Sequence, residues 1–355
     1  MIKSIYIHIP FCNKICTYCD FCKIYYNSNI VNDYLKELEK EVKENYKKEI
    51  IETVYIGGGT PSCLNKKELN KLFSITDMIT LNDNYEFTFE CNIENINKDF
   101  LKELKKSKVN RLSIGVQSFN KDILKKLGRN YNSDIKDKID LCKKYFANIN
   151  VDLIYGINGQ SLKGLKEDLD SFINLNINHI SIYSLILENN TILKINNYKE
   201  IKDDLSRKMY DFICKYLKEK GYNHYEISNF EKNNTASKHN LTYWNNNKYY
   251  GFGIGASGYI NDIRYTNTRS MTNYLKGKRY NEICKITKKI DMENFMILGL
   301  RKTKGVSNKD FKKRYNKNIE EVFNTKNLKI ENDYYYISED NLYISNYILK
   351  DFIDI

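Results

Sequence analysis

Three cysteines near the amino terminus carry the strongest chemical signal in the sequence. Cys12, Cys16 and Cys19 follow the spacing C-x3-C-x2-C, directly after the largely apolar run 4–11. Three thiolates on one short loop can bind three irons of a [4Fe-4S] cluster, and the iron left without a cysteine can bind a substrate. A structural zinc site usually takes four ligands from two separated pairs. No second separated pair follows, so we expect a cluster rather than a zinc site or three unrelated thiols.

A run of glycines is the second unusual feature. Gly57-Gly58-Gly59-Thr60 lets the backbone approach a polar ligand without interference from Cβ atoms. Its N–H and C=O groups could hold the carboxylate or the amino group of a bound amino acid. By itself the run also fits a tight turn between a strand and a helix. Its position, one strand after the cysteines, favours the ligand interpretation.

The elements that position these residues alternate regularly. Apolar, β-branched runs predict strands at residues 4–9, 53–56, 85–90, 111–116, 150–155 and 179–185. Helical periodicity falls between them, at residues 32–47, 66–79, 97–106, 133–145 and 162–175. This order predicts a parallel sheet with right-handed crossovers, closed wholly or partly into a barrel. The unusual residues follow strand ends, so one mouth of the barrel is expected to gather them.

We therefore expect an α/β fold with three parts. Residues 1–200 form a partial (β/α)6 barrel, and residues 201–290 form an extension that contains His239-Asn240-x-x-Tyr243-Trp244. Residues 291–355 form a small winged-helix-like α+β unit, for which packing is favoured over nucleic-acid binding. Within it we expect a hairpin of strands 334–338 and 342–344 around a turn at 339–341.

Composition restricts the classes of function. The net charge is +12, but Lys is mixed with Glu along helical segments, which is typical of solvated faces, so no nucleic-acid partner is expected. No apolar run reaches transmembrane length. Nine cysteines without a signal-peptide pattern favour a reducing, cytoplasmic location. The positive charge suits an acidic ligand and leaves peripheral membrane contact open.

Longer motifs bring in a family resemblance. The runs Tyr6-x-His8-Ile9-Pro10-Phe11-Cys12, Gly57-Gly58-Gly59-Thr60-Pro61-Ser62, Ser113-Ile114-Gly115-Val116-Gln117-Ser118-Phe119, Leu127-Gly128-Arg129, Asp152-Leu153-Ile154-Tyr155-Gly156 and Gln160-Ser161 carry it. They resemble the radical S-adenosylmethionine (SAM) superfamily and, more closely, the oxygen-independent coproporphyrinogen III oxidase family, over nearly the whole chain. The resemblance implies that the three cysteines bind the cluster and that SAM chelates its open iron. It also implies that SAM is held by Tyr6, Tyr18, Gly58, Gly59, Thr60, Glu90, Gln117, Arg129, Asp152 and Ser184.

Those residue types suit SAM. Glu90 and Asp152 can accept hydrogen bonds from the amino group or ribose hydroxyls, and Arg129 can pair with a carboxylate. Alternatively, Arg129 and Asp152 form an ion pair at the barrel rim, and Ser184 only makes room. The resemblance further implies an electron donor, because an electron must enter the sulfonium to release methionine and a 5′-deoxyadenosyl radical.

Three features favour one branch of that family, the HemW-type heme chaperones. The motif of the oxidases is C-x3-C-x2-C-x-C, after a longer amino-terminal extension. Here Phe21 occupies the position of the last cysteine, and only eleven residues precede Cys12. The H-N-x-x-Y-W run at residues 239–244 also resembles the chaperones. Imidazole can bind heme iron and aromatic rings can cover a porphyrin, so His239 is predicted to be a heme ligand. Alternatively, His239 and Asn240 bond only to backbone groups and Trp244 belongs to the core.

The main functional interpretation is therefore binding of heme, or a porphyrin, and its transfer to acceptor proteins. One alternative is oxidative decarboxylation of coproporphyrinogen III to protoporphyrinogen IX, and another is radical opening of heme. Whether the chain is an enzyme stays open at this point. Cys22 is expected to be a free thiol of the cysteine loop rather than a fourth cluster ligand or a heme thiolate.

Overall fold

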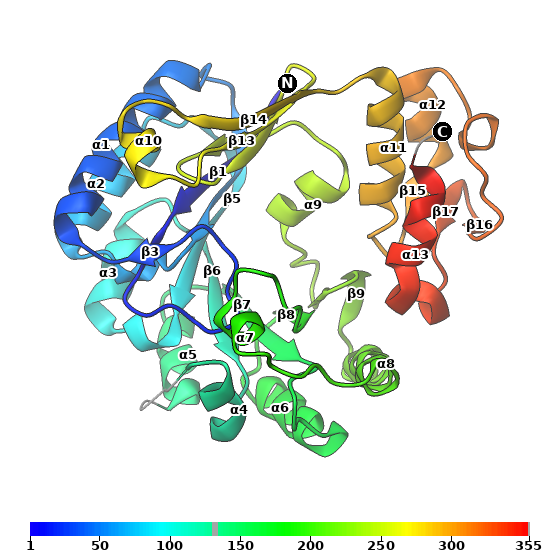
Figure 1. Ribbon diagram of the computed structural model, residues 1–355, viewed down its shortest axis with the longest axis horizontal. Coiled ribbons are helices and arrows are strands. Elements are labelled where there is room, and N and C mark those ends of the chain that lie inside the picture. The colour runs from blue at the N-terminus through cyan, green and yellow to red at the C-terminus, as the bar shows by residue number, and fades with distance from the viewer. Residues whose placement is uncertain (130–133, 354–355) are drawn as a thin grey trace.

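The computed structural model describes residues 1–129 and 134–353 and is built around one curved sheet of nine strands (Figure 1). The order is β11-β1-β4-β5-β6-β7-β8-β10-β9. Six strands run parallel at its centre: β1 (Ser4–Ile9), β4 (Ile51–Gly58), β5 (Leu81–Asn92), β6 (Arg111–Gln117), β7 (Asn148–Tyr155) and β8 (His179–Ser184). The predicted α/β class and parallel sheet are confirmed. The edge strands β11 and β9 do not pair with each other, so the barrel is partial.

Helices cover the outer face of the sheet. They are α1 (Ser28–Asn45), α2 (Lys66–Thr76), α3 (Lys98–Lys106), α4 (Lys121–Lys126), α5 (Ile135–Lys143) and α6 (Leu162–Asn174). The Asn-rich composition serves them, because Asn27, Asn65, Asn97 and Asn120 each cap a helix amino terminus with the side-chain oxygen. The predicted helix 133–145 begins at Ile135, and its first residue lies outside the described residues. Within residues 1–129 and 134–353, no helix is long and apolar enough to cross a membrane.

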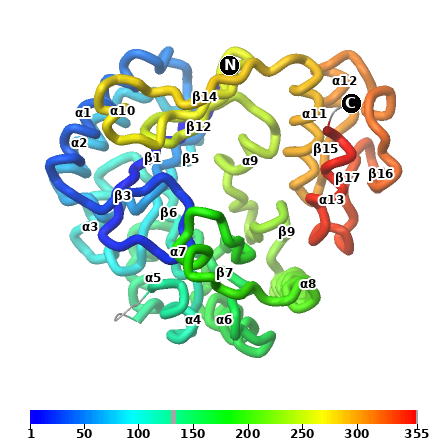
Figure 2. Tube along the Cα trace, viewed as in Figure 1, coloured from blue at the N-terminus to red at the C-terminus, as the bar shows by residue number. Residues whose placement is uncertain are grey.

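The segment after β8 completes the sheet and adds a plug. Helix α8 (Asp203–Glu219) leads into β9 (Asn223–Glu226) and β10 (Asn229–Glu231), and β11 (Tyr250–Phe252) joins β1 at the other edge. Between them, α9 (Lys238–Trp244) lies between the main sheet and α11 (Lys288–Gly299) (Figures 1 and 2). A second sheet follows, with β12 (Ser257–Ile260), β13 (Ile263–Asn267) and β14 (Tyr280–Lys285), and α10 (Met271–Leu275) connects β13 to β14. Since this segment supplies three strands of the main sheet, the boundaries at residues 200 and 290 stay predictions.

The carboxy-terminal unit combines helices with a small sheet. It contains α11, α12 (Asn308–Tyr315) and α13 (Ser345–Leu349), with β15 (Val306–Ser307), β17 (Tyr334–Tyr336) and β16 (Lys329–Glu331) in that order across the sheet. The predicted hairpin is wrong: β17 pairs with β16, and residues 339–344 form a 3-10 helix. The turn lies at Asn332 and Asp333, whose φ angles of 48° and 73° suit a two-residue hairpin loop.

Candidate functional site

The cysteine loop, residues 12–23, is fastened to the strand that precedes it. Beside it, β2 (Phe11–Cys12) pairs with β3 (Ile24–Tyr25). The Nε2 atom of His8 lies 2.7 Å from the carbonyl oxygen of Cys22, which can only accept, so Nε2 carries the proton. Nδ1 of His8 then accepts from the Tyr6 hydroxyl at 2.9 Å. Burial lowers the pKa of His8 to about 4 and keeps the ring neutral.

The three predicted cluster cysteines lie together on this loop. Burial raises the pKa of Cys12 to about 11 and also raises that of Cys19. The hydroxyl of Thr60 donates to Cys12 Sγ over 3.4 Å. Among residues 1–129 and 134–353, no three His, Cys, Asp or Glu side chains are grouped closely enough to hold one metal ion. A cubane does not need that grouping, because each thiolate binds a different iron.

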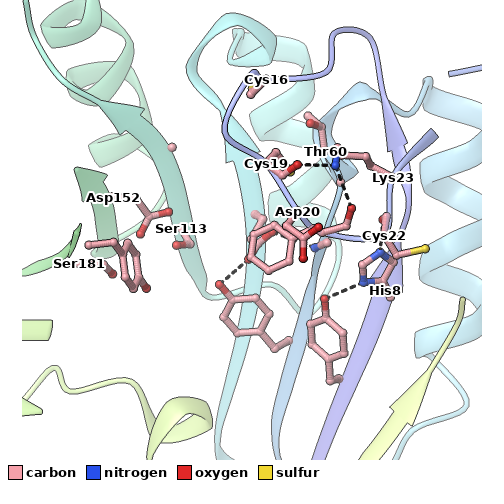
Figure 3. Close-up of a pocket in the computed structure, with 18 of the residues that line it drawn as sticks. His8, Cys16, Cys19, Asp20, Cys22, Lys23, Thr60, Ser113, Asp152 and Ser181 are labelled. Carbon is pink, nitrogen blue, oxygen red and sulfur yellow. Dashed lines mark hydrogen bonds between the residues drawn. The ribbon is translucent and has the colours of Figure 1, made fainter. Parts of the chain in front are cut away.

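Cys22 is turned away from the other loop thiols. Its Sγ lies 3.9 Å from the carbonyl oxygen of Arg269, and in Figure 3 the sulfur points away from Cys16 and Cys19. This placement suits a free thiol, as expected from the sequence.

The glycine run makes room for protein groups rather than for a ligand alone. A Cβ on Gly57 would lie 2.7 Å from Glu90 Cδ, and one on Gly58 would lie 2.5 Å from the His8 ring. Gly58 has a φ of 114°, and its N–H donates to Glu90 Oε2 at 3.0 Å. The glycines therefore let β4 approach His8 and orient the Glu90 carboxylate.

Two carboxylates lie in the interior behind the cysteine loop. Glu90 accepts from the Tyr55 hydroxyl at 2.8 Å, and Asp152 accepts from Asn150 Nδ2 at 2.7 Å. Burial, aided by the charge of Asp152, raises the pKa of Glu90 to about 7. Burial also raises the pKa of Asp152. Such groups are strong acceptors that a bound amino group or hydroxyl could satisfy.

Gln117 and Arg129 face the same space from the end of β6 and the loop after α4. Gln117 has a φ of 74°, a left-handed conformation that is costly for a residue with a side chain and is often found at functional sites. The guanidinium of Arg129 donates to Asn92 Oδ1 and to the Tyr18 hydroxyl, each at 2.9 Å. The charge of Arg129 also reaches Asp152, where it offsets part of the effect of burial on the pKa of that carboxyl group.

One cavity of about 920 Å³ joins these groups, and Figure 3 shows part of its wall. Its volume is near the upper end of the usual range for sites that bind small molecules and cofactors. Every residue predicted from the sequence to bind the cluster or SAM lines it: Cys12, Cys16, Cys19, Tyr6, Tyr18, Gly58, Gly59, Thr60, Glu90, Gln117, Arg129, Asp152 and Ser184. The structure thus brings together residues that are up to 178 positions apart, from Tyr6 to Ser184.

The cavity extends to α9, at the opposite end of the strands. The side chains of Ser4 and Thr53, near the starts of β1 and β4, hydrogen-bond to Thr242 and His239 of this helix at 2.8 Å each. The Glu86 carboxylate of β5 accepts the backbone N–H groups of Lys238 and His239 at 3.1 Å, which also stabilises the helix amino terminus. We call the wall formed by Asn240, Tyr243, Trp244 and Asn247 the cavity floor.

His239 is not brought to this cavity. Its side chain is 1% exposed, Nδ1 contacts the Thr53 hydroxyl and Nε2 contacts the Tyr243 hydroxyl, both at 2.8 Å. Burial lowers its pKa to about 3. Because both nitrogens contact hydroxyl groups and the ring does not line the cavity, the geometry does not support His239 as a heme ligand. Its partners are side chains, not the backbone groups of the alternative, and Trp244 is half-buried in the cavity wall rather than in the core.

Sequence reasoning overlooked several lining residues between the two ends. Arg111, Ser113, Asn150 and Ser181 lie inside the sheet below the predicted SAM residues. The sequence does contain a pattern that could have identified them, because side chains two positions apart in a strand point to the same face. Arg111 and Ser113 therefore share a face of β6 with Gln117. Asn150 relates to Asp152 of β7 in the same way.

Comparison with known proteins agrees with this arrangement. The Radical SAM superfamily profile matches residues 6–172, and the HemN C-terminal domain profile matches residues 286–342. The heme chaperone HemW of Lactococcus lactis subsp. lactis (strain IL1403) is 39% identical over 99% of this chain and 97% of that protein. The heme chaperone HemW of Bacillus subtilis (strain 168) is 38% identical over 90% of this chain and 89% of that protein.

A solved structure reports on the fold alone. Coproporphyrinogen III oxidase (HemN) from Escherichia coli, a radical SAM enzyme, superposes with a TM-score of 0.87 over 99% of this chain and 90% of that chain, at 19% identity. The family itself follows from the far higher identity to the two HemW proteins over nearly their whole length. The chain therefore belongs to the HemW family within the radical SAM superfamily.

Proposed function

We propose that this protein is a heme chaperone that carries a [4Fe-4S] cluster and SAM, holds heme, and passes it to acceptor proteins. The observation that carries the proposal is the near full-length similarity to proteins named heme chaperone HemW. The cavity supports it, since a single space runs from the cysteine loop to the H-N-x-x-Y-W helix.

The residues of the cysteine-loop end fit a cluster and SAM. Membership of the radical SAM superfamily implies both groups. In this proposal Cys12, Cys16 and Cys19 hold the cluster, and SAM is held by Tyr6, Tyr18, Gly58, Gly59, Thr60, Glu90, Gln117, Arg129, Asp152 and Ser184. A cluster with an open iron supplies single-electron chemistry when bound. The protein supplies buried acceptors at Glu90 and Asp152 and the His8 anchor that holds the loop.

Heme is proposed to lie between those residues and the cavity floor. Tyr243 and Trp244 offer aromatic surface, and Asn240 offers polar contacts. At the mouth, Phe21 is 68% exposed. It stands where the motif of the oxidases has its last cysteine. This leaves an apolar rim by which heme or an acceptor protein could approach. An electron donor and a cytoplasmic location complete the proposal, the latter supported by nine free cysteines.

The test begins with anaerobic reconstitution of the full chain with iron and sulfide, followed by titration with heme and recording of the absorption spectrum. A saturable heme complex, released to excess apomyoglobin as a general heme acceptor, is the expected result. Absence of any heme complex in a protein with an intact cluster would overturn the proposal.

A second assay separates chaperone from enzyme. The reconstituted protein is incubated with SAM, a strong reductant and either coproporphyrinogen III or heme. We expect both tetrapyrroles to be recovered unchanged. Formation of protoporphyrinogen IX would instead identify an oxidase, and loss of the intact porphyrin spectrum would identify a heme-degrading enzyme.

A further inference from the structure

The interior of the cavity holds a buried cation that forms no ion pair with any residue that the structure describes. Arg111, the first residue of β6, is 2% exposed and lines the cavity. Its Nη1 makes one long hydrogen bond of 3.4 Å to Thr88 Oγ1, and its Nε has no hydrogen-bond partner. Among the residues that the structure describes, no carboxylate oxygen lies within 4.0 Å of this guanidinium.

Arg279, whose side chain is also little exposed, is neutralised by the protein. It pairs with Glu37 at 2.8 Å and with Glu44 at 2.6 Å. A buried charge without such a partner is costly, because the lost hydration is not replaced. Arg111 is more deeply buried than Arg279 but has no such pair, and it lies at the wall of the ligand cavity.

No carboxylate contacts Arg111 among the described residues, but Asp152 lies near enough for the charge of Arg111 to offset part of the effect of burial on its pKa. Asn150 donates to Ser113 at 2.9 Å and to Ser181 at 3.0 Å, and these side chains are uncharged. Burial, and then the charge of Arg111, lower the pKa of His179 and of His239, so both rings stay neutral. Asp152 lies opposite Gly115 in the β6–β7 register, four residues along the strand from Arg111, and its carboxylate is held by Asn150.

We infer that Arg111 is a carboxylate-binding residue, and that the carboxylate it receives is a propionate of the bound porphyrin. The planar guanidinium matches a carboxylate, which explains an arginine here rather than a lysine. This inference rests on the proposed function and adds an orientation: an acidic edge of the porphyrin lies inside the sheet, between the predicted SAM residues and the cavity floor. The SAM carboxylate is the other source of such a group, but Arg129 is the cation beside the cysteine loop.

The test compares ligands that differ only in the proposed contact. Wild type, Arg111→Gln and Arg111→Lys, each reconstituted as the full chain, are titrated with heme, with heme dimethyl ester, which lacks free carboxylates, and with iron-free protoporphyrin IX. Arg207→Gln is the matched control, since it removes the same charge from α8, outside the cavity wall. SAM affinity is measured in parallel by calorimetry.

We expect wild type to bind heme about 10–100-fold more tightly than its dimethyl ester, the usual contribution of a hydrogen-bonded charged group. Arg111→Gln should weaken heme binding and so bring the ratio of heme affinity to ester affinity near one. Arg111→Lys should keep part of this ratio, and Arg207→Gln should keep all of it. The affinity for iron-free protoporphyrin IX should depend on Arg111 in the same way as the affinity for heme. SAM affinity should change less than about twofold.

Several results would overturn the inference, and they differ from failure of the proposed function. Equal affinity of wild type for heme and its ester would overturn it without any variant, even if the variants did not fold. The inference would also be overturned if Arg111→Gln kept the wild-type ratio of heme affinity to ester affinity, whether or not that variant lost SAM affinity. If Arg111 only supports the fold, the apoprotein of Arg111→Gln should unfold at a lower temperature, whereas we expect an equal or higher one. Wild type that binds no heme at all would instead mean that the proposed function is wrong.

Discussion

The two ends of the cavity are built in different ways. At the cysteine-loop end, most candidate ligands stand at or just beyond the carboxy-terminal end of a strand, as Glu90, Gln117 and Ser184 do. At the floor, the wall comes from a helix whose polar residues mostly hold the helix to the sheet. His239 shows this best, because it bonds to Thr53 and Tyr243 while Trp244 faces the cavity. A motif residue at a strand end is thus a safer candidate ligand than one on a plugging helix.

The largest effect should come from replacing the predicted cluster cysteines, a change that affects only the cysteine-loop end of the cavity. Cys12→Ala should abolish the iron–sulfur absorption and the iron content of the reconstituted protein, because the cluster loses one of three thiolates. Cys284→Ala, an exposed thiol, is the control and should retain the cluster, as should Cys22→Ala. Loss of the cluster in Cys22→Ala would make that residue a fourth ligand and contradict its placement.

Replacement of His239 should separate structure from ligation at the second end. His239→Ala leaves the Thr53 and Tyr243 hydroxyls without a partner and opens a cavity, so it should lower the free energy of unfolding by about 2–4 kcal/mol. Urea denaturation measures this change. The heme absorption bands should keep their positions in the variant that remains folded. A shift of those bands that imidazole added to the solution reverses would show that His239 binds iron after all.

Replacement of Glu90 should weaken SAM binding and leave heme binding unchanged. Glu90→Gln keeps the size of the side chain but removes its charge, so SAM binding should weaken about 10–100-fold. Calorimetry on the reconstituted protein measures this loss, and the heme titration should be unchanged. Equal weakening of both ligands would mean that the two ends do not act separately.

The pH dependence sharpens the same point. The pKa of Glu90 is raised from 4.5 to about 7 in the folded protein, so the stability that protonated Glu90 contributes is present below about pH 4.5 and lost as pH rises through about 7. The free energy of unfolding of the apoprotein should fall over this range by up to roughly 3 kcal/mol. SAM affinity should improve over the same range, because the charged carboxylate is the better acceptor. Glu90→Gln should remove both dependences, and their persistence would assign them to another group.

The smallest expected effect concerns neither end. Asn65 and Glu68 form a capping box at the start of α2, where the Asn65 N–H donates to Glu68 Oε2 at 2.8 Å. Asn65→Ala should lower the free energy of unfolding by about 1 kcal/mol and leave heme and SAM affinities unchanged. Thermal unfolding and the two titrations measure this. A change in either affinity would mean that outer helices influence the cavity.

Local patterns were enough to predict the parallel sheet, its six central strands and the residues at their carboxy-terminal ends. This succeeds because strand period, glycine runs and cysteine spacing are properties of short segments, and parallel strands place their ends at one edge. The C-terminal hairpin was misplaced because Asn332-Asp333 is a weak turn signal in an Asn-rich chain, and only the φ angles identify the loop.

What tertiary structure decided is the direction and pairing of individual side chains. The sequence places His239 and Arg111 among polar and aromatic neighbours, but it does not tell which of them finds a partner. That depends on Thr53 and Tyr243 meeting the imidazole, and on the absence of a carboxylate within 4.0 Å of the guanidinium among the described residues. Hydrogen bonds form only over a few ångströms and in defined directions, so they follow from the packing of distant segments and not from spacing along the chain.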